Sequence, residues 1–237
     1  MCEFVSLLVF GPKLVNLYGE LVSCADHGHS HSATETWLGL DVKNDFAWAK
    51  VEITPTKFLA DFASYRFRLD EERKPDWWTD EHEARALAQG IKVAESLVKL
   101  DEQGRVIHWP GNITAANIGM IGDTSALTTV GGNLYCSGNT TATFEALTTV
   151  GGYLDCSGNT TATFEALTTV GGYLYCSGNT TATFEALTTV GGNLYCSGNT
   201  TATFEALTTV GGYLYCRGNT TIGESALNRF KGKVVRS

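Results

Sequence analysis

The sequence predicts an α+β N-terminal domain followed by a short right-handed parallel β-solenoid with 20-residue coils. From Ala126 onward, the unit ALTTVGGYLYCSGNTTATFE recurs almost verbatim. One such unit cannot bury its own apolar face, so the copies must stack on one another. The composition before the repeats is different, because all five Trp, all five His and all four Pro lie within the first 110 residues.

We expect five segments, set by the start of the repeats and by the changes in composition. An apolar, His-rich N-terminal segment, in which mobility is expected, precedes a small α+β domain. A capping coil, five full repeats and a degenerate capping repeat complete the chain. The expected boundaries, in that order, are 1–34, 35–104, 105–125, 126–225 and 226–237.

Two strands and one helix are expected in the N-terminal domain. The alternating run at 46–53 predicts a strand that is ended by Pro55. The run Tyr-Arg-Phe-Arg-Leu at 65–69 predicts a second strand. Thr79 is a suitable N-cap before two acidic residues, and it starts an amphipathic helix that runs to about Leu100.

Three histidines, His27, His29 and His31, alternate with small residues close to Cys24. Imidazoles can ligate a metal, but this stretch is rich in Gly and Ser and typical of a mobile linker. We therefore expect no metal site and no cofactor, with these histidines as the candidate ligands if a metal is bound. An enzymatic alternative needs this cluster or Asp41 to hold a metal. No Ser/His/Asp grouping, phosphate loop or paired-carboxylate spacing is present, so we expect no enzyme.

The second repeat contains a short alternating strand at 153–157. Leu154 and Cys156 are apolar and are expected inside, so residues 153, 155 and 157 face outward. Asn159 closes the strand and is expected to hydrogen-bond to turn backbone groups and to its counterparts in neighbouring coils.

The return path of each coil is expected to be an irregular or 3₁₀-like arc. Phe164, Leu167 and Val170 are three residues apart, which points every third side chain inward. Before the repeats, residues 118–123 mimic the Leu-x-Cys-x-x-Asn strand and predict a shortened first coil. At the other end, residues 233–236 predict a last strand whose charges discourage further stacking.

Five of the seven cysteines occupy the same position in successive repeats, namely Cys136, Cys156, Cys176, Cys196 and Cys216. The odd total and the absence of a CxxC motif favour a column of buried, reduced thiols over a disulfide framework. Reduced thiols indicate a reducing compartment. The N-terminal run VSLLVF is too short to span a membrane and has no basic region before it. We expect a cytoplasmic protein without membrane contact.

The pattern Leu154-x-Cys156-x-x-Asn159, followed by the three arc residues, resembles the LxLxxN core of leucine-rich repeats in the short 20-residue bacterial form. The phrase Leu-x-x-Val-Gly-Gly-x-Leu-x-Cys is more similar still to uncharacterised repeat proteins of phage and bacterial genomes. Thr161 stands where leucine-rich repeats usually place Leu, and the proline after the arc is missing. The resemblance covers about residues 105–237 and implies a binding scaffold without catalytic residues.

The repeats differ almost only at the outward positions of the strand. Among the first four full repeats, every substitution falls in one of two columns of equivalent residues 20 positions apart. One column is 133, 153, 173 and 193, the other is 135, 155, 175 and 195, and the fifth repeat continues them at 213 and 215. Seven of the nine tyrosines stand in these columns, and protein interfaces favour exposed tyrosine. The expected partner-binding residues are Tyr135, Tyr153, Asp155, Tyr173, Tyr175, Tyr195, Tyr213, Tyr215 and Arg217.

The formal net charge of −8 argues against direct nucleic-acid binding, which needs clustered Lys and Arg. It leaves a protein partner, for example a basic nucleic-acid-binding protein. We expect a non-enzymatic protein-binding module, and the resemblance implies a phage-encoded inhibitor of a host or defence protein. One alternative is a self-assembling structural protein that uses the same face as a homo-oligomer contact. Another is an ice-binding protein that uses the Thr-Ala-Thr row at 141–143 and its counterparts.

Overall fold

A computed structural model describes residues 5–24, 31–40, 47–70, 73–138, 142–160, 163–180, 183–200, 203–219, 222–230 and 232–235. The chain forms two compact units, Met1–Leu97 and Val98–Ser237. Each unit has its own set of buried apolar side chains, and each is described by itself below. No helix in the described ranges is both long and apolar enough to cross a membrane.

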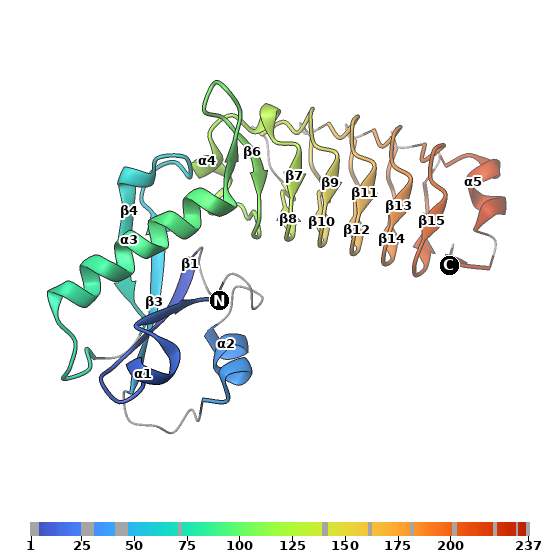
Figure 1. Cartoon of the computed structure of the whole chain (residues 1–237). Helices are drawn as coiled ribbons and strands as arrows, with labels where there is room; N and C mark the ends of the chain where they lie inside the picture. Colours follow the sequence, from blue (N-terminus) through green and yellow to red (C-terminus); the bar gives the residue numbers. More distant parts are fainter. Residues whose placement is uncertain are drawn as a thin grey trace. The chain divides into compact units, whose positions relative to one another are not determined.

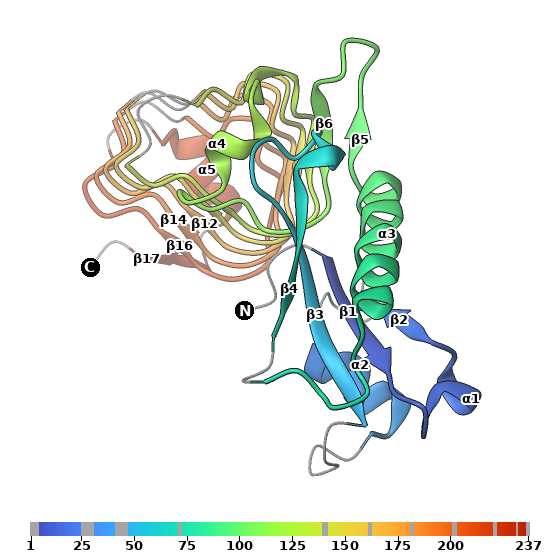
Figure 2. The same ribbon diagram turned by 90° about the vertical axis from the view of Figure 1, so that its left-hand side faces the viewer.

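The first unit is built on an antiparallel sheet with strand order β2-β1-β3-β4 in its described part (Figure 2). These strands are β1 (Val5–Phe10), β2 (Leu21–Ser23), β3 (Trp48–Pro55) and β4 (Tyr65–Leu69). Two short elements, α1 (Val15–Tyr18) and η2 (Phe62–Ser64), connect them. Every side chain of β1 is buried, and β1 pairs with β3 along its whole length.

Two helices cover opposite faces of this sheet. Helix α3 (Asp80–Leu97) packs on the face that carries Ile53, and a Cβ at Gly90 of this helix would overlap the Ile53 side chain. Successive residues of a strand point to opposite faces, so the next residue, Glu52, lies on the other face. There it faces α2 (His31–Leu38), which contacts β3 through polar side chains.

The elements predicted for this unit are largely confirmed. Strand β4 coincides with the expected 65–69, and α3 ends three residues before Leu100 because Lys99–Leu100 forms the short strand β5. Strand β3 begins at Trp48 and includes Pro55. The segment expected to be mobile, 1–34, contains β1, β2 and the start of α2.

The second unit is a parallel β-solenoid of about six coils, each about 20 residues long. Each full coil contributes two strands of two residues, one to each of two sheets (Figure 1). Paired residues are 20 positions apart, so the coils stack in register, as with Leu154 and Leu174. The predicted solenoid of 20-residue coils is therefore confirmed.

One sheet, here called the tyrosine sheet, holds the Leu-Tyr strands. It has six strands within the described residues, in the order β17-β16-β14-β12-β10-β8. They are β8 (Leu134–Tyr135), β10 (Leu154–Asp155), β12 (Leu174–Tyr175), β14 (Leu194–Tyr195), β16 (Leu214–Tyr215) and β17 (Val234–Val235).

The other sheet, here called the threonine sheet, holds the Thr-Val strands. It has seven strands within the described residues, and only its first pair, β5 with β6, is antiparallel. They are β5, β6 (Val106–Trp109), β7 (Thr129–Val130), β9 (Thr149–Val150), β11 (Thr169–Val170), β13 (Thr189–Val190) and β15 (Thr209–Val210).

The solenoid core is made of the residues expected to point inward. Leu154, Cys156, Phe164, Leu167 and Val170 are all buried, as are the matching Leu, Cys, Phe, Leu and Val within 134–150, 174–190 and 194–210. The phenylalanines form a column of parallel rings whose centroids are 5.4–5.6 Å apart. The expected irregular arc is wrong at its end, because Thr169 and Val170 form a strand. Both residues are β-branched and suit an extended backbone.

Two glycine positions allow the coils to turn sharply and to stack closely. A Cβ at Gly171, in the corner between the two sheets, would overlap the carbonyl oxygen of Gly151 in the coil before it. Gly178, in the turn after the tyrosine-sheet strand, has a φ of 65°, in the left-handed region that favours glycine. A side chain at either position would distort the stack.

The two ends of the solenoid differ from its full coils. The strand expected at 118–123 is wrong, because Ile118–Ile121 is the helix α4, followed by η3 (Thr124–Ala126). Ile113 pairs with Leu134 instead and begins the tyrosine sheet. At the other end, α5 (Glu224–Arg229) precedes β17, whose Val234 pairs with Leu214 as expected of a last strand.

Candidate functional site

Tyrosine side chains cover the outer surface of the tyrosine sheet. Because the leucines of its strands point into the core, the neighbouring tyrosines point outward. Three of them are the most exposed, with relative accessibilities of 37% for Tyr135, 40% for Tyr153 and 54% for Tyr213, and the other four are half-buried. The name tyrosine face is used below for Tyr135, Tyr153, Tyr173, Tyr175, Tyr195, Tyr213 and Tyr215.

The rings of the tyrosine face stack along the solenoid. Centroids of parallel rings are 4.7 Å apart for Tyr175 and Tyr195 and 4.6 Å apart for Tyr195 and Tyr215. In the neighbouring column, Tyr153 and Tyr173 are 4.9 Å apart. Tyr173 also meets Tyr175 edge-on at 6.1 Å, which joins the two columns. Tyr213 completes the series through its contact with Tyr215 at 6.3 Å, so ring contacts join six of the seven tyrosines, all except Tyr135.

Two asparagines complete the tyrosine face, and no sequence pattern marked them as functional. Asn193 donates from Nδ2 to the hydroxyl oxygen of Tyr195 at 2.8 Å, and its Oδ1 accepts from the backbone N–H of Tyr213 at 2.8 Å. Asn133 makes the same two bonds, to Tyr135 and Tyr153. An Asn in this column therefore replaces one ring and fixes the hydroxyl beside it.

Asp155 interrupts the ring column, because it lies in register between Tyr135 and Tyr175. Its carboxylate accepts a hydrogen bond from the backbone N–H of Ser157 at 3.0 Å. Desolvation, and next the charge repulsion of the nearby phenol groups of Tyr195 and Tyr173, raise the pKa of Tyr175 above its ordinary value. The tyrosine face therefore offers a partner aromatic rings and phenolic hydroxyl groups.

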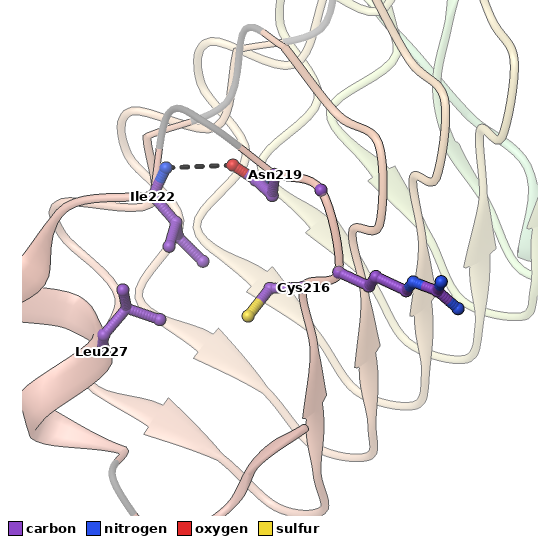
Figure 3. A pocket seen from close by; sticks show the side chains of 6 residues that line it. Cys216, Asn219, Ile222 and Leu227 are labelled. Carbon is purple, nitrogen blue, oxygen red and sulfur yellow. Dashed lines mark hydrogen bonds between the residues drawn. The ribbon is translucent and has the colours of Figure 1, made fainter. Parts of the chain in front are cut away.

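Arg217 is exposed at the end of the face, where the sheet meets α5. It borders a pocket of about 290 Å³ that is also lined by Cys216, Gly218, Asn219, Ile222 and Leu227 (Figure 3). The side chain of Asn219 accepts the N–H of Ile222 at 3.0 Å and so shapes the rim. The lining residues offer one thiol, one guanidinium group and one amide among apolar side chains.

The cysteine column lies behind the tyrosine sheet. All five repeat cysteines are buried free thiols. Burial raises the pKa of Cys136 and of Cys196 to about 12, and that of Cys156 and Cys176 well above the ordinary value. A thiol reacts as its thiolate, so these groups are poor nucleophiles and poor metal ligands.

The candidate metal-ligating and ice-binding residues lie elsewhere in the chain. His31 is buried at the start of α2, whereas His27, His29 and Asp41 lie outside the described residues. The threonines of the expected ice-binding row are half-buried where the structure describes them, at 143, 163, 183 and 203. Next to the strands of the threonine sheet, Thr168 donates from Oγ1 to the carbonyl oxygen of Thr148 in the preceding coil at 3.0 Å.

Neither protein-family models, nor curated proteins, nor solved structures give a match to this chain.

Proposed function

We propose that this chain is a non-enzymatic protein-binding module that docks a protein partner on the tyrosine face. The observation that carries the proposal is the group of six outward tyrosines that ring contacts join on one sheet of the solenoid. Across the outward positions of the five repeat strands, only Asp155 and Arg217 are charged. Enrichment in tyrosine and depletion of charge are the marks of an interface core.

The packing of the face supports binding in a second way. Because the rings of Tyr175 and Tyr195 stack on each other, they lose little freedom when a partner covers them. Binding by ordered side chains avoids the entropy loss that flexible ones suffer. Tyrosine also presents a hydroxyl at its tip, so a partner can bury apolar area and still form hydrogen bonds.

The charge distribution supports a basic partner. The return segments carry exposed glutamates at 145, 165, 185 and 205, and Arg217 is the only basic residue between 124 and 225. An acidic module of this kind favours a basic nucleic-acid-binding protein by charge complementarity. The resemblance to leucine-rich repeats and to repeat proteins of phage and bacterial genomes supports a host or defence protein as this partner. The reduced cysteine column supports a cytoplasmic location.

The test is capture of binding proteins from bacterial lysate by the wild-type chain and by a triple variant, Tyr173→Ser/Tyr175→Ser/Tyr195→Ser. The matched control, Thr149→Ser/Thr169→Ser/Thr189→Ser, alters the threonine sheet in the same region of the solenoid. We expect one protein that the wild type and the control retain and that the tyrosine variant loses, after circular dichroism shows that all three fold.

Equal capture by the tyrosine variant would contradict the proposal. Sedimentation at several concentrations separates partner binding from self-association. A wild-type chain that dimerises through the tyrosine face and captures no other protein would replace the proposed partner with a second copy of this chain.

A further inference from the structure

Three ionisable side chains meet at the start of α2 in the first unit. The Nδ1 atom of His31 is 3.7 Å from Oε1 of Glu52 and 3.7 Å from Oδ2 of Asp70. Ligand atoms of the three residues all lie within 4.8 Å of one another. His31 and Glu52 are almost completely buried, and Asp70 is about half exposed. Burial of an imidazole and a carboxylate together is costly unless their charges are balanced.

Three different elements bring these residues together. His31 is the first residue of α2, Glu52 lies on β3, and Asp70 directly follows β4. The backbone N–H of Asp70 donates to the carbonyl oxygen of Lys50 at 2.8 Å, which fixes the end of β4 against β3. The pairing of the two strands therefore sets the separation of the two carboxylates.

Neighbouring groups orient both buried side chains. Nε2 of His31 lies 3.2 Å from the carbonyl oxygen of Val51, and a carbonyl can only accept, so Nε2 carries the proton. In the neutral ring, Nδ1 then has the lone pair, and it faces the carboxylates. Ser6 donates from Oγ to Oε2 of Glu52 at 3.1 Å, and Oε1 is the oxygen that faces the histidine. Histidines and carboxylates that bind metals are oriented by such outer hydrogen bonds.

We propose that Nδ1 of His31, Oε1 of Glu52 and Oδ2 of Asp70 bind a divalent transition-metal ion of the zinc class. Zinc bonds to nitrogen and carboxylate oxygen at about 2.0–2.2 Å, which places neighbouring ligand atoms a little over 3 Å apart. The two 3.7 Å separations from His31 need to shrink by only a few tenths of an ångström, and the two carboxylates, which lie within 4.8 Å of each other, need to approach by at most about 1.5 Å. The ion balances the charge of buried Glu52 and shares that of Asp70 with Arg68, whose guanidinium is 4.0 Å from Oδ1, and the exposed side of Asp70 leaves a position open to solvent.

This site differs from the expected histidine cluster. It uses His31 but takes its other ligands from β3 and from the end of β4. It is independent of the tyrosine face, because it lies in the other unit. It also departs from the expectation of a protein without a metal.

The test is titration of the chelator-stripped full chain with Co²⁺, followed by d–d absorption, and competition of the bound Co²⁺ by Zn²⁺. We expect one ion per chain, displaced by one equivalent of Zn²⁺. Asp70→Asn is expected to abolish this binding, because it removes one ligand at a half-exposed position. Asp76→Asn, an exposed carboxylate of the same unit, is the matched control and should bind as the wild type does.

Two further variants test whether the ion binds at these three residues. Ser6→Ala removes only the bond that orients Glu52 and is expected to weaken Co²⁺ binding about 10–100-fold. A His27→Ala/His29→Ala variant should keep full binding. The proposal is overturned if the wild type binds no Co²⁺ at 100 μM, the result expected of a protonated His31 paired with both carboxylates. It is equally overturned if Asp70→Asn binds normally and the double histidine variant does not.

Discussion

The buried asparagine column shows how single residues hold the solenoid coils in register. Asn159, Asn179 and Asn199 are completely buried. Each donates from Nδ2 to the carbonyl oxygen of a cysteine in the preceding coil, for example from Asn179 to Cys156 at 3.1 Å. A buried amide is tolerated only when it is hydrogen-bonded. A slip of one residue would break all of these bonds at once, so the column favours a single register.

Leu174→Ala and Tyr175→Ser test the inner and outer sides of one strand. Leu174 is completely buried, so its truncation is expected to lower the free energy of unfolding by about 2–5 kcal/mol. Tyr175 is half-buried, and Tyr175→Ser is expected to cost about 0.5–1.5 kcal/mol, chiefly through loss of ring stacking. Urea denaturation of both variants provides the comparison. Equal, large losses would show that the tyrosine belongs to the core.

At the scale of the element, the solenoid strands are stable although each has only two residues. A strand such as β12 pairs with β10 on one side and β14 on the other, so its backbone groups are bonded within the ladder. The flanking Gly-Gly corner brings neighbouring coils into close contact, and the N–H of Gly171 donates to the carbonyl oxygen of Val150 at 2.8 Å. Stacking therefore replaces strand length as the source of stability.

Gly171→Ala tests the corner, and Gly119→Ala is its control. A Cβ at Gly171 would overlap the backbone of Gly151, whereas a Cβ at Gly119 in α4 has no heavy atom within 4 Å. We expect Gly171→Ala to lower the free energy of unfolding by about 1–3 kcal/mol, as overpacking does. Gly119→Ala should be neutral or slightly stabilising, because alanine favours a helix. Similar effects of both changes in thermal denaturation would show that the corner has room to adjust.

Alternation in the sequence was sufficient to predict which repeat residues point inward, such as Leu154 and Cys156. The strand at Thr169–Val170 was missed because two residues are too few to show a period. Strand β1 was missed because all six of its positions are buried, so no polar residue marks a face. Residues 118–123 have the apolar spacing of a repeat strand, yet Ile118–Ile121 forms a helix at the end of the stack.

The sequence reveals one of the two candidate sites and not the other. The tyrosine face was visible because its residues recur every 20 positions. The group of His31, Glu52 and Asp70 was not visible, since these residues are far apart in sequence. Only the pairing of β3 with β4 and the position of α2 bring them together.

At the scale of the whole molecule, the buried thiols of Cys136, Cys156, Cys176 and Cys196 make the stability of the solenoid depend on pH. Each thiol is buried, and those of Cys156, Cys176 and Cys196 donate to a carbonyl oxygen of the following coil. Burial raises the pKa of Cys196 from 9.0 to about 12. In the unfolded chain the thiol ionises above about pH 9, while in the folded chain it stays protonated. The unfolded chain then holds fewer protons, so stability falls as the pH rises.

Comparison of the wild type with Cys196→Ala measures this contribution. The stabilisation from the raised pKa is complete below about pH 9 and is lost as the pH rises towards 12. Over that window the wild type should lose about 1.4 kcal/mol per pH unit more than Cys196→Ala. Tyrosines and lysines titrate in both proteins, so their effects cancel in the difference. Urea denaturation between about pH 7.5 and 10.5 checks this expectation, and parallel curves for the two proteins would show that the thiol can ionise inside the stack.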